Sequence, residues 1–149
     1  MSGVGSTHAT ANRRAAMLKT AFGPVIGAAL EDESVSEIMA NPGGALFIER
    51  LGIGPDRQDP GLPAGDVERI IRLIASHIGA ACDRDHPIVS AELPGTGERF
   101  EGVLPPVSLA PAFSIRKPAR RAMSIADWVA SGAMTRGDAL ILQSALARR

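Results

Sequence analysis

Two stretches of the chain place their apolar residues on one side of a helix. In residues 13–30 the apolar positions lie three and four residues apart, and Gly23-Pro24 falls in the middle. Proline removes a backbone hydrogen bond and clashes with the preceding turn, so the pattern predicts a helix with a kink at Gly23-Pro24. Residues 66–78 carry a second apolar stripe, and the following Gly79 predicts the end of that helix. The stripe consists of Val67, Ile70, Ile71, Ile74 and Ile78.

A short third helix is predicted between these two. Ser34 and Glu37 have the spacing of a capping box, in which each side chain binds a free backbone amide of the other residue. We therefore expect a helix that begins after Ser34 and runs through Met39.

The residues after this predicted helix indicate a turn and a strand. Residues 41–44 are Asn-Pro-Gly-Gly, which is typical of a turn. Residues 45–50 have strand-forming composition and alternate in polarity, so they predict a strand. The connection 52–65 is rich in Gly, Pro and Asp, and we expect one short return strand near it, at 51–53.

Alternating polarity also marks the second half of the chain. Residues 88–93 and 98–104 alternate and are separated by a Pro-Gly-Thr-Gly turn at 94–97. Pro105-Pro106 ends the second of these strands, because proline cannot donate to a strand ladder. Residues 112–117 predict a third strand. Together the three form a small antiparallel meander.

Two capping signals close the chain. Ser124 with Asp127 and Thr135 with Asp138 predict the N-termini of two short helices. The last helix runs to the end of the chain without a terminal breaker, so we expect the chain to be part of a longer protein.

These elements define a fold class and a domain organisation. Helices and strands follow one another in an order that predicts an α+β fold, with helices packed on a small, mostly antiparallel sheet. Residues 1–12 are rich in Ser, Thr, Gly and Ala and predict a disordered lead-in. Residues 13–149 are predicted to form a single domain.

Composition narrows the class of protein. The chain has 16 Lys and Arg residues against 16 Asp and Glu residues, so its formal net charge is zero. A neutral chain lacks the broad positive field of nucleic-acid-binding proteins, and we expect no sequence-specific nucleic-acid binding. Cys82 is the single cysteine, which excludes an intrachain disulfide. No apolar run approaches the length of a membrane span, so we expect a cytoplasmic protein.

The motifs of common catalytic sites are missing from the sequence. It contains no Gly-x-x-x-x-Gly-Lys-Ser/Thr phosphate loop, no His-Glu-x-x-His and no Cys-x-x-Cys. Residues 93–98, Leu-Pro-Gly-Thr-Gly-Glu, are similar to a phosphate loop but lack its lysine and the following helix. We interpret them as a hairpin turn, and we predict no catalytic or metal-binding residue in this chain.

Two groups of side chains remain as candidates for chemistry. Cys82 and His86 flank a charged loop that combines a thiol, carboxylates and an imidazole, but a solvated loop with internal charge pairs explains the same residues. Arg99 and Arg116 lie on two strands of one sheet and are able to converge on an anion such as phosphate. Alternatively, these arginines face solvent or pair with Glu98 and Glu101, which lie on the predicted strand 98–104.

The sequence around these arginines resembles a known family. Residues 92–119 resemble the N-terminal domain of TrbB-type conjugal-transfer ATPases, which belong to the type II/type IV secretion ATPase family. Three motifs carry the likeness: Gly-Glu-Arg at 97–99, Leu-Pro-Pro-Val at 104–107 and Ser-Ile-Arg-Lys-Pro at 114–118. Residues 35–42 and 46–52 extend it toward the N-terminus.

This resemblance implies a function for the parent protein. Family members are hexameric cytoplasmic ATPases, peripheral to the inner membrane, that power conjugative transfer or type IV secretion. ATP and Mg would be bound by a C-terminal P-loop domain that this chain lacks, and we expect no cofactor for the isolated fragment and no ATP hydrolysis by it. The implied partners are that domain, the neighbouring subunits and the secretion machinery.

The resemblance also implies roles for individual residues. Arg99 and Arg116 match the positions that contact the terminal phosphates of the nucleotide. Lys117, Arg120 and Arg121 are secondary basic contacts in this interpretation.

Two other functions are open on the sequence alone. The chain is alternatively a free-standing protein-interaction module without nucleotide binding, which would dock a partner through Trp128 and the apolar face of the last helix. A small enzyme that uses Cys82 and His86 is the third hypothesis.

Overall fold

The chain divides into two compact units. The computed structural model describes residues 4–118 and 123–148. Contacts separate Met1–Pro118 from Ala119–Arg149, whereas the sequence predicted one domain over 13–149.

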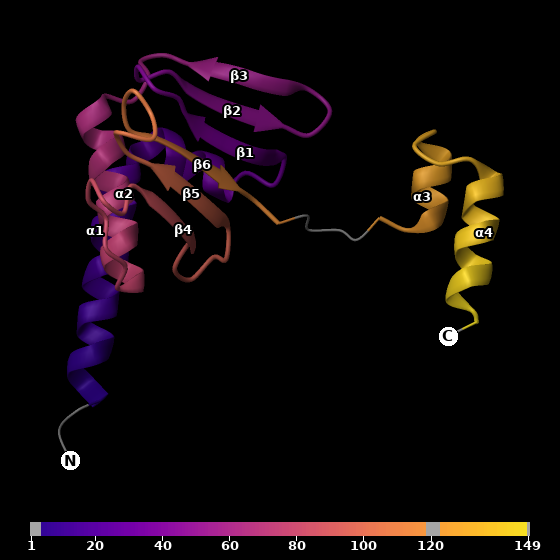
Figure 1. Cartoon of the computed structure of the whole chain (residues 1–149), viewed down its shortest axis with the longest axis horizontal. Helices are drawn as coiled ribbons and strands as arrows, with labels where there is room; N and C mark the ends of the chain where they lie inside the picture. The colour runs from indigo at the N-terminus through magenta and orange to yellow at the C-terminus, as the bar shows by residue number, and fades with distance from the viewer. Residues whose placement is uncertain (1–3, 119–122, 149) are drawn as a thin grey trace. The chain divides into compact units, whose positions relative to one another are not determined.

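The larger unit is built on a six-stranded sheet in which every neighbouring pair is antiparallel (Figure 1). The strand order is β3-β2-β1-β6-β5-β4, so the N-terminal hairpins join the C-terminal meander through the β1–β6 pair. The strands are β1 (Val35–Ala40), β2 (Leu46–Arg50), β3 (Gly54–Gln58), β4 (Ile88–Glu92), β5 (Arg99–Val103) and β6 (Ala112–Arg116). The predicted α+β fold and the predicted meander of β4, β5 and β6 are confirmed.

Two helices lie side by side on one side of this sheet (Figure 1). Helix α1 (Val4–Glu31) has the predicted kink, with Gly23 in a non-helical conformation at φ 66°. It begins at Val4, so the backbone of residues 4–12 is helical where the sequence predicted a disordered lead-in; residues 1–3 lie outside the described residues.

Helix α2 (Ala64–Ile78) provides the centre of the core. Its buried face carries the predicted stripe up to Ile74, and Gly79 ends it in the left-handed conformation at φ 70°. The ring of Phe100 on β5 is fully buried, and its centroid lies 5.6 Å from the centroid of the Phe113 ring on β6. An added Cβ at Gly102 would lie 2.8 Å from Phe100 and 2.9 Å from Ile71, so the absent side chain at Gly102 allows helix, ring and sheet to pack closely.

The short helix predicted after Ser34 is wrong, because these residues form strand β1. Ser34 does not cap a helix; its amide and its hydroxyl both donate to the Asp32 carboxylate, at 2.9 and 2.7 Å. These two bonds hold the turn between α1 and β1 and, with the Arg50 guanidinium 3.6 Å away, lower the pKa of Asp32. Strand β1 then pairs on both sides, with β2 and β6.

The return strand lies beyond the predicted 51–53. Those residues form the turn after β2, and β3 follows at Gly54–Gln58. The turn at 41–44 and the strand at 45–50 are confirmed, with Gly44 N–H donating to the Asn41 carbonyl at 3.1 Å.

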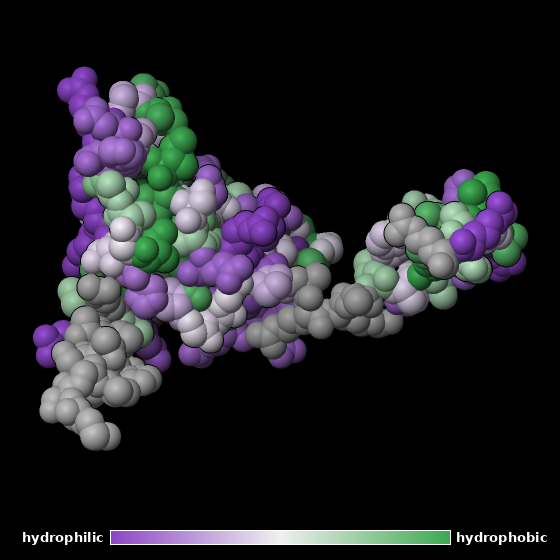
Figure 2. Space-filling model, turned by 60° about the horizontal axis from the view of Figure 1, so that its bottom comes forward, coloured by the Kyte–Doolittle hydropathy of each residue, from purple (hydrophilic) through white to green (hydrophobic). Residues whose placement is uncertain are grey.

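The smaller unit contains the two predicted C-terminal helices, α3 (Ile125–Ala130) and α4 (Arg136–Leu146). Ser124 and Asp127 form a complete capping box, and the Thr135 hydroxyl accepts from the Asp138 amide. Apolar side chains lie at the surface of this unit beside hydrophilic ones (Figure 2). The large exposed ones are Met123, Trp128, Leu140, Ile141, Leu142 and Leu146.

Across residues 4–118 and 123–148, none of the helices combines the length and the apolar character that crossing a bilayer requires.

Candidate functional site

Strand register brings the two predicted arginines together. Arg99 on β5 is the direct partner of Arg116 on β6. On the outer side of each arginine lies a glutamate, because Glu92 on β4 pairs with Arg99 and Glu37 on β1 pairs with Arg116. Glu37 is in turn opposite Glu49 on β2. We call these residues the charged row: Glu92, Arg99, Arg116, Glu37 and Glu49.

The charged row lies on the face of the sheet that α1 and α2 do not cover. Successive side chains of a strand point to opposite faces. Phe100 and Ile115 are fully buried against the helices, so the adjacent Arg99 and Arg116 point away from them and are exposed. A polar row on the open face and an apolar core on the other therefore follow from the same alternation.

Direct opposition of two arginines is unfavourable without an anion. Residues directly opposite on antiparallel strands have Cβ atoms about 4.5–5.5 Å apart, and like charges at this distance repel. Guanidinium groups bind phosphate and carboxylate oxygens through paired N–H donors, and such charge-assisted bonds are the stronger ones. The Arg99–Arg116 pair is consequently suited to an anion placed over β5 and β6.

Among the described residues, Arg116 pairs with the carboxylate of Glu37. Its Nη2 donates to Glu37 Oε2 at 3.2 Å. The other carboxylate oxygen, Oε1, accepts from the hydroxyl of Ser114, two residues earlier on β6. The Glu37 side chain is only 17% exposed, whereas that of Arg116 is 72% exposed, so the carboxylate is fixed and the guanidinium reaches solvent.

The alternative pairing with Glu98 and Glu101 is not what the structure shows. Glu98 is buried, and Glu101 Oε2 accepts from the hydroxyl of Ser90 at 2.8 Å. The arginine partner that sequence reasoning missed is Glu37, because residues 34–39 were assigned to a helix. A strand assignment for that segment would have provided the signal.

Lys117 does not join the arginine pair, which corrects its prediction as a secondary basic contact. It directly follows Arg116, the last residue of β6, and points to the other face of the sheet, where it is only 9% exposed. Its Nζ donates to three backbone carbonyls at the C-terminal end of α1: Ala29 at 3.2 Å, Leu30 at 2.7 Å and Asp32 at 2.6 Å. The ammonium thus satisfies helix-end carbonyls that have no partner within the helix. The other two secondary contacts, Arg120 and Arg121, lie outside the described residues.

The Cys82–His86 loop is a charge-paired loop. Asp83 Oδ1 accepts from the amides of His86 and Asp85 at 2.8 and 2.9 Å and lies 3.1 Å from His86 Nδ1. The His86 backbone bond, followed by its side chain, lowers the pKa of Asp83. Within the described part of the chain, no three His, Cys, Asp or Glu side chains are grouped to hold a metal ion.

Cys82 is expected to be a slow nucleophile. Partial burial raises the pKa of its thiol, so the thiolate fraction at neutral pH is smaller than that of a free cysteine. Alkylation by iodoacetamide at pH 7.5 should therefore be slower than that of glutathione, as followed by mass spectrometry. A rate equal to or above that of glutathione would contradict this expectation and favour the hypothesis of an enzyme that uses Cys82 and His86.

The turn at 93–98 is the predicted hairpin turn. Leu93 N–H donates to the Glu98 carbonyl at 2.8 Å, and Gly97 N–H donates back to the Leu93 carbonyl at 3.1 Å. The backbone of this segment is thus engaged in closing the β4–β5 hairpin.

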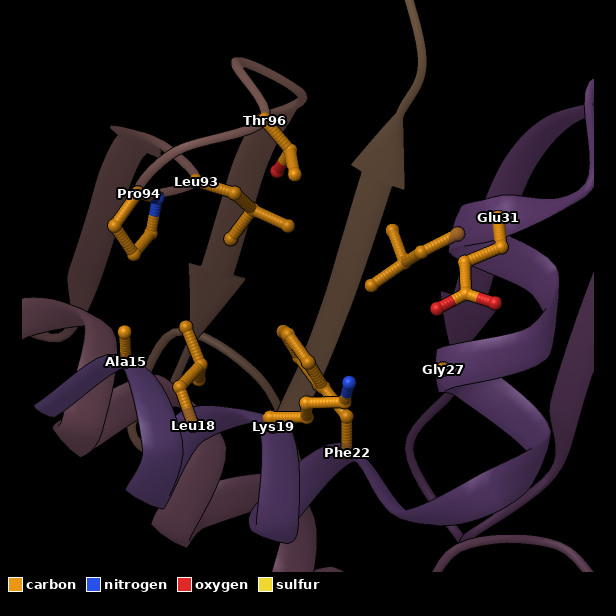
Figure 3. Close-up of a pocket in the computed structure, with 10 residues that line it drawn as sticks. Ala15, Leu18, Lys19, Phe22, Gly27, Glu31, Leu93, Pro94 and Thr96 are labelled. Atoms are coloured by element: carbon orange, nitrogen blue, oxygen red, sulfur yellow. The ribbon is translucent and has the colours of Figure 1, made fainter. Parts of the chain in front are cut away.

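A separate hollow lies where α1 bends (Figure 3). It has a volume of about 270 Å³ and is lined mainly by apolar side chains of α1 and of the β4–β5 turn, with Lys19 and Glu31 among the lining residues. Neither Arg99 nor Arg116 lines it. The hollow is therefore distinct from the charged row.

Comparison with known proteins gives relatives of two kinds. No protein-family profile matches the chain. It is 43% identical over 137 residues to the probable conjugal transfer protein TrbB of Sinorhizobium fredii, covering 89% of this chain and 40% of that protein. TrbB of Rhizobium radiobacter is 42% identical over 132 residues, with 89% and 41% covered. The type IV secretion system protein VirB11 of Bartonella henselae is 30% identical over 127 residues, with 84% and 35% covered.

A solved structure shares the fold. The VirB11 ATPase of the Brucella suis type IV secretion system, determined in complex with sulphate, superposes with a TM-score of 0.69 and 25% sequence identity. The match covers 85% of this chain and 38% of that protein. The chain thus spans about two fifths of the length of the relatives it matches, at 40% and 41% of the two TrbB proteins.

Fold and sheet topology therefore define the class: the chain shares the α+β fold of the matching part of the VirB11 ATPase. Within that class the chain is homologous to the TrbB conjugal transfer proteins. The resemblance predicted from residues 92–119 is confirmed.

Proposed function

We propose that this chain is the N-terminal domain of a hexameric ATPase that powers conjugative transfer, and that Arg99 and Arg116 cover the terminal phosphates of its nucleotide. One observation carries the proposal: the two arginines that match the family pattern are direct cross-strand partners on an open sheet face. Homology to TrbB and VirB11 supports the assignment to a secretion ATPase.

The chemistry of this role is electrostatic. In the proposed parent protein, ATP and Mg are held by a P-loop domain, whose backbone amides and single lysine cradle the phosphates. Additional guanidinium groups stabilise the charge that develops on the γ-phosphate. The Arg99–Arg116 pair would supply this charge, and the chain itself would contribute no catalytic base.

The smaller unit supports the presence of a further domain. Many of its large apolar side chains are exposed, and units below about 40 residues rarely bury enough surface to be stable alone. We propose that α3 and α4 pack against the ATPase domain, and that neighbouring subunits complete the ring. Such a protein would work on the cytoplasmic side of the inner membrane with the secretion machinery.

Substitution of Arg116 tests the proposal. In the full-length protein, Arg116→Ala is expected to raise the KM or lower the kcat for ATP hydrolysis at least tenfold, since a hydrogen bond to a charged group contributes about 1.5–3 kcal/mol. Because the side chain is exposed, the thermal midpoint should change little. Steady-state kinetics across an ATP titration, with a thermal melt of each variant, measure both.

Arg57→Ala is the matched control. Arg57 is an exposed arginine on β3, paired with Phe47, whose neighbours place it on the same open face. Three strand spacings separate β3 from β6, roughly 14 Å. Unchanged kinetics for Arg57→Ala are expected. Unchanged kinetics for Arg116→Ala as well would reject the phosphate site and favour the interaction module, for which the exposed Trp128 and α4 would be the docking surface.

A further inference from the structure

Glu37 occupies an unusual position beside the proposed phosphate site. It is a carboxylate in direct contact with the guanidinium that the proposed function assigns to a phosphate, with Arg116 Nη2 and Glu37 Oε2 at 3.2 Å. An anion that binds Arg116 therefore meets a resident negative charge. Either the Arg116 guanidinium leaves Glu37 when the anion binds, or it contacts Glu37 and the anion at the same time.

The carboxylate is held independently of Arg116. Ser114 donates its hydroxyl to Glu37 Oε1, and the side chain is 17% exposed. Register fixes the backbone as well, because Glu37 pairs with Arg116 on one side and with Glu49 on the other. Glu37 thus stays in place while the exposed guanidinium of Arg116 is able to move.

The neighbouring charge favours the return of Arg116. Glu49 is directly opposite Glu37, and like charges so placed repel. Arg116 offsets the repulsion between Glu37 and Glu49 when it contacts Glu37. The repulsion returns when Arg116 leaves. The charged row is consequently more favourable with Arg116 on Glu37 whenever no anion is present.

We infer that Glu37 is the resting partner of Arg116, which exchanges between this carboxylate and the terminal phosphate of the nucleotide. This inference rests on the proposed function. Glu37 is a positioning residue that acts through Arg116: it holds the guanidinium in the empty state and competes with phosphate for it. Loss of the competing charge should therefore strengthen nucleotide binding, but only while Arg116 is present.

A double-mutant cycle on the full-length protein tests the exchange. The dissociation constant of a non-hydrolysable ATP analogue with Mg is measured by calorimetry for the wild type, Glu37→Gln, Arg116→Ala and the double variant. Glutamine keeps the shape and the Ser114 contact but removes the charge. Glu37→Gln is expected to tighten binding roughly two- to fivefold, the range of an exposed ion pair. In the Arg116→Ala background the same change should have no effect.

Glu49→Gln is the matched control, because it removes the same charge from the next position of the row without touching Arg116. It should change the affinity less than Glu37→Gln does. Weaker or unchanged binding for Glu37→Gln, with Arg116→Ala defective, would overturn the exchange and leave the proposed function intact. Equal tightening with and without Arg116 would overturn it too, because the charge would then act through its field alone. A normal affinity for Arg116→Ala would instead reject the phosphate site itself.

Discussion

Replacing Lys117 by methionine should destabilise the larger unit by about 3–5 kcal/mol, since each hydrogen bond to a charged group contributes about 1.5–3 kcal/mol and water replaces part of the loss. The Lys117 ammonium donates to three carbonyls at the end of α1 in an almost fully buried position. Methionine retains the apolar stem but leaves those oxygens without this donor. It also removes a positive charge from the negative end of the helix dipole.

Urea unfolding followed by circular dichroism measures this loss. Lys19→Met is the control, because Lys19 is an exposed lysine on α1, the helix whose end Lys117 contacts. Its replacement should change the free energy of unfolding by no more than about 0.5 kcal/mol. Equal midpoints for the two variants would show that the buried ammonium does not stabilise the fold. A lower midpoint for Lys117→Met, at an unchanged slope, would agree with the geometry.

Phe100→Ala should cost about 3–5 kcal/mol, the usual range for removing a buried aromatic ring. The ring is fully buried, packs 5.6 Å from Phe113 and fills the space above Gly102. Neighbouring groups are parts of a helix and a sheet, so they are unable to collapse into the cavity.

Phe47→Ala serves as its comparison. Phe47 lies on β2 with its side chain only partly buried, so truncation there removes less buried surface. The same urea experiment should show a clearly smaller loss for Phe47→Ala. Similar losses at both positions would place the energetic centre of the unit away from the Phe100–Phe113 pair.

Much of the fold was predictable because its elements have a regular period. Helix α2 and the meander of β4, β5 and β6 carry clear periods of 3.6 and 2 residues, and the structure confirms them. The prediction of a helix in place of strand β1 was wrong for a physical reason. A register irregularity between Val35 and Glu37 breaks its alternation, so the buried Val35 and Ile38 lie three residues apart, as on a helix. Strand β3 has mostly exposed side chains and lies at the sheet edge, so burial leaves no pattern in its sequence.

The candidate site was predictable only in part. Two arginines on strands of one sheet predict a shared anion, but their direct opposition depends on the register of β5 against β6, which the sequence of each strand does not specify. Glu37 contacts Arg116 across 79 positions of sequence, a distance at which local patterns carry no information. Lys117 comes directly after Arg116, and adjacent residues of a strand point to opposite faces of the sheet. Strand geometry alone therefore predicts that Lys117 points away from the arginine pair.

Arg116 and Lys117 point to opposite faces of the sheet, and this arrangement also disfavours a shift of β6 in register. If β6 slid by one residue, every side chain would change faces. The Arg116 guanidinium would then enter the space beneath the end of α1 that the Lys117 ammonium occupies, and Lys117 would emerge on the open face. A bulky planar cation would replace a compact one among the α1 carbonyls, and the arginine pair would be lost. Lys117 thereby makes the correct alignment of β6 a condition of a stable helix end, which ties the presentation of Arg116 to the folding of the whole unit.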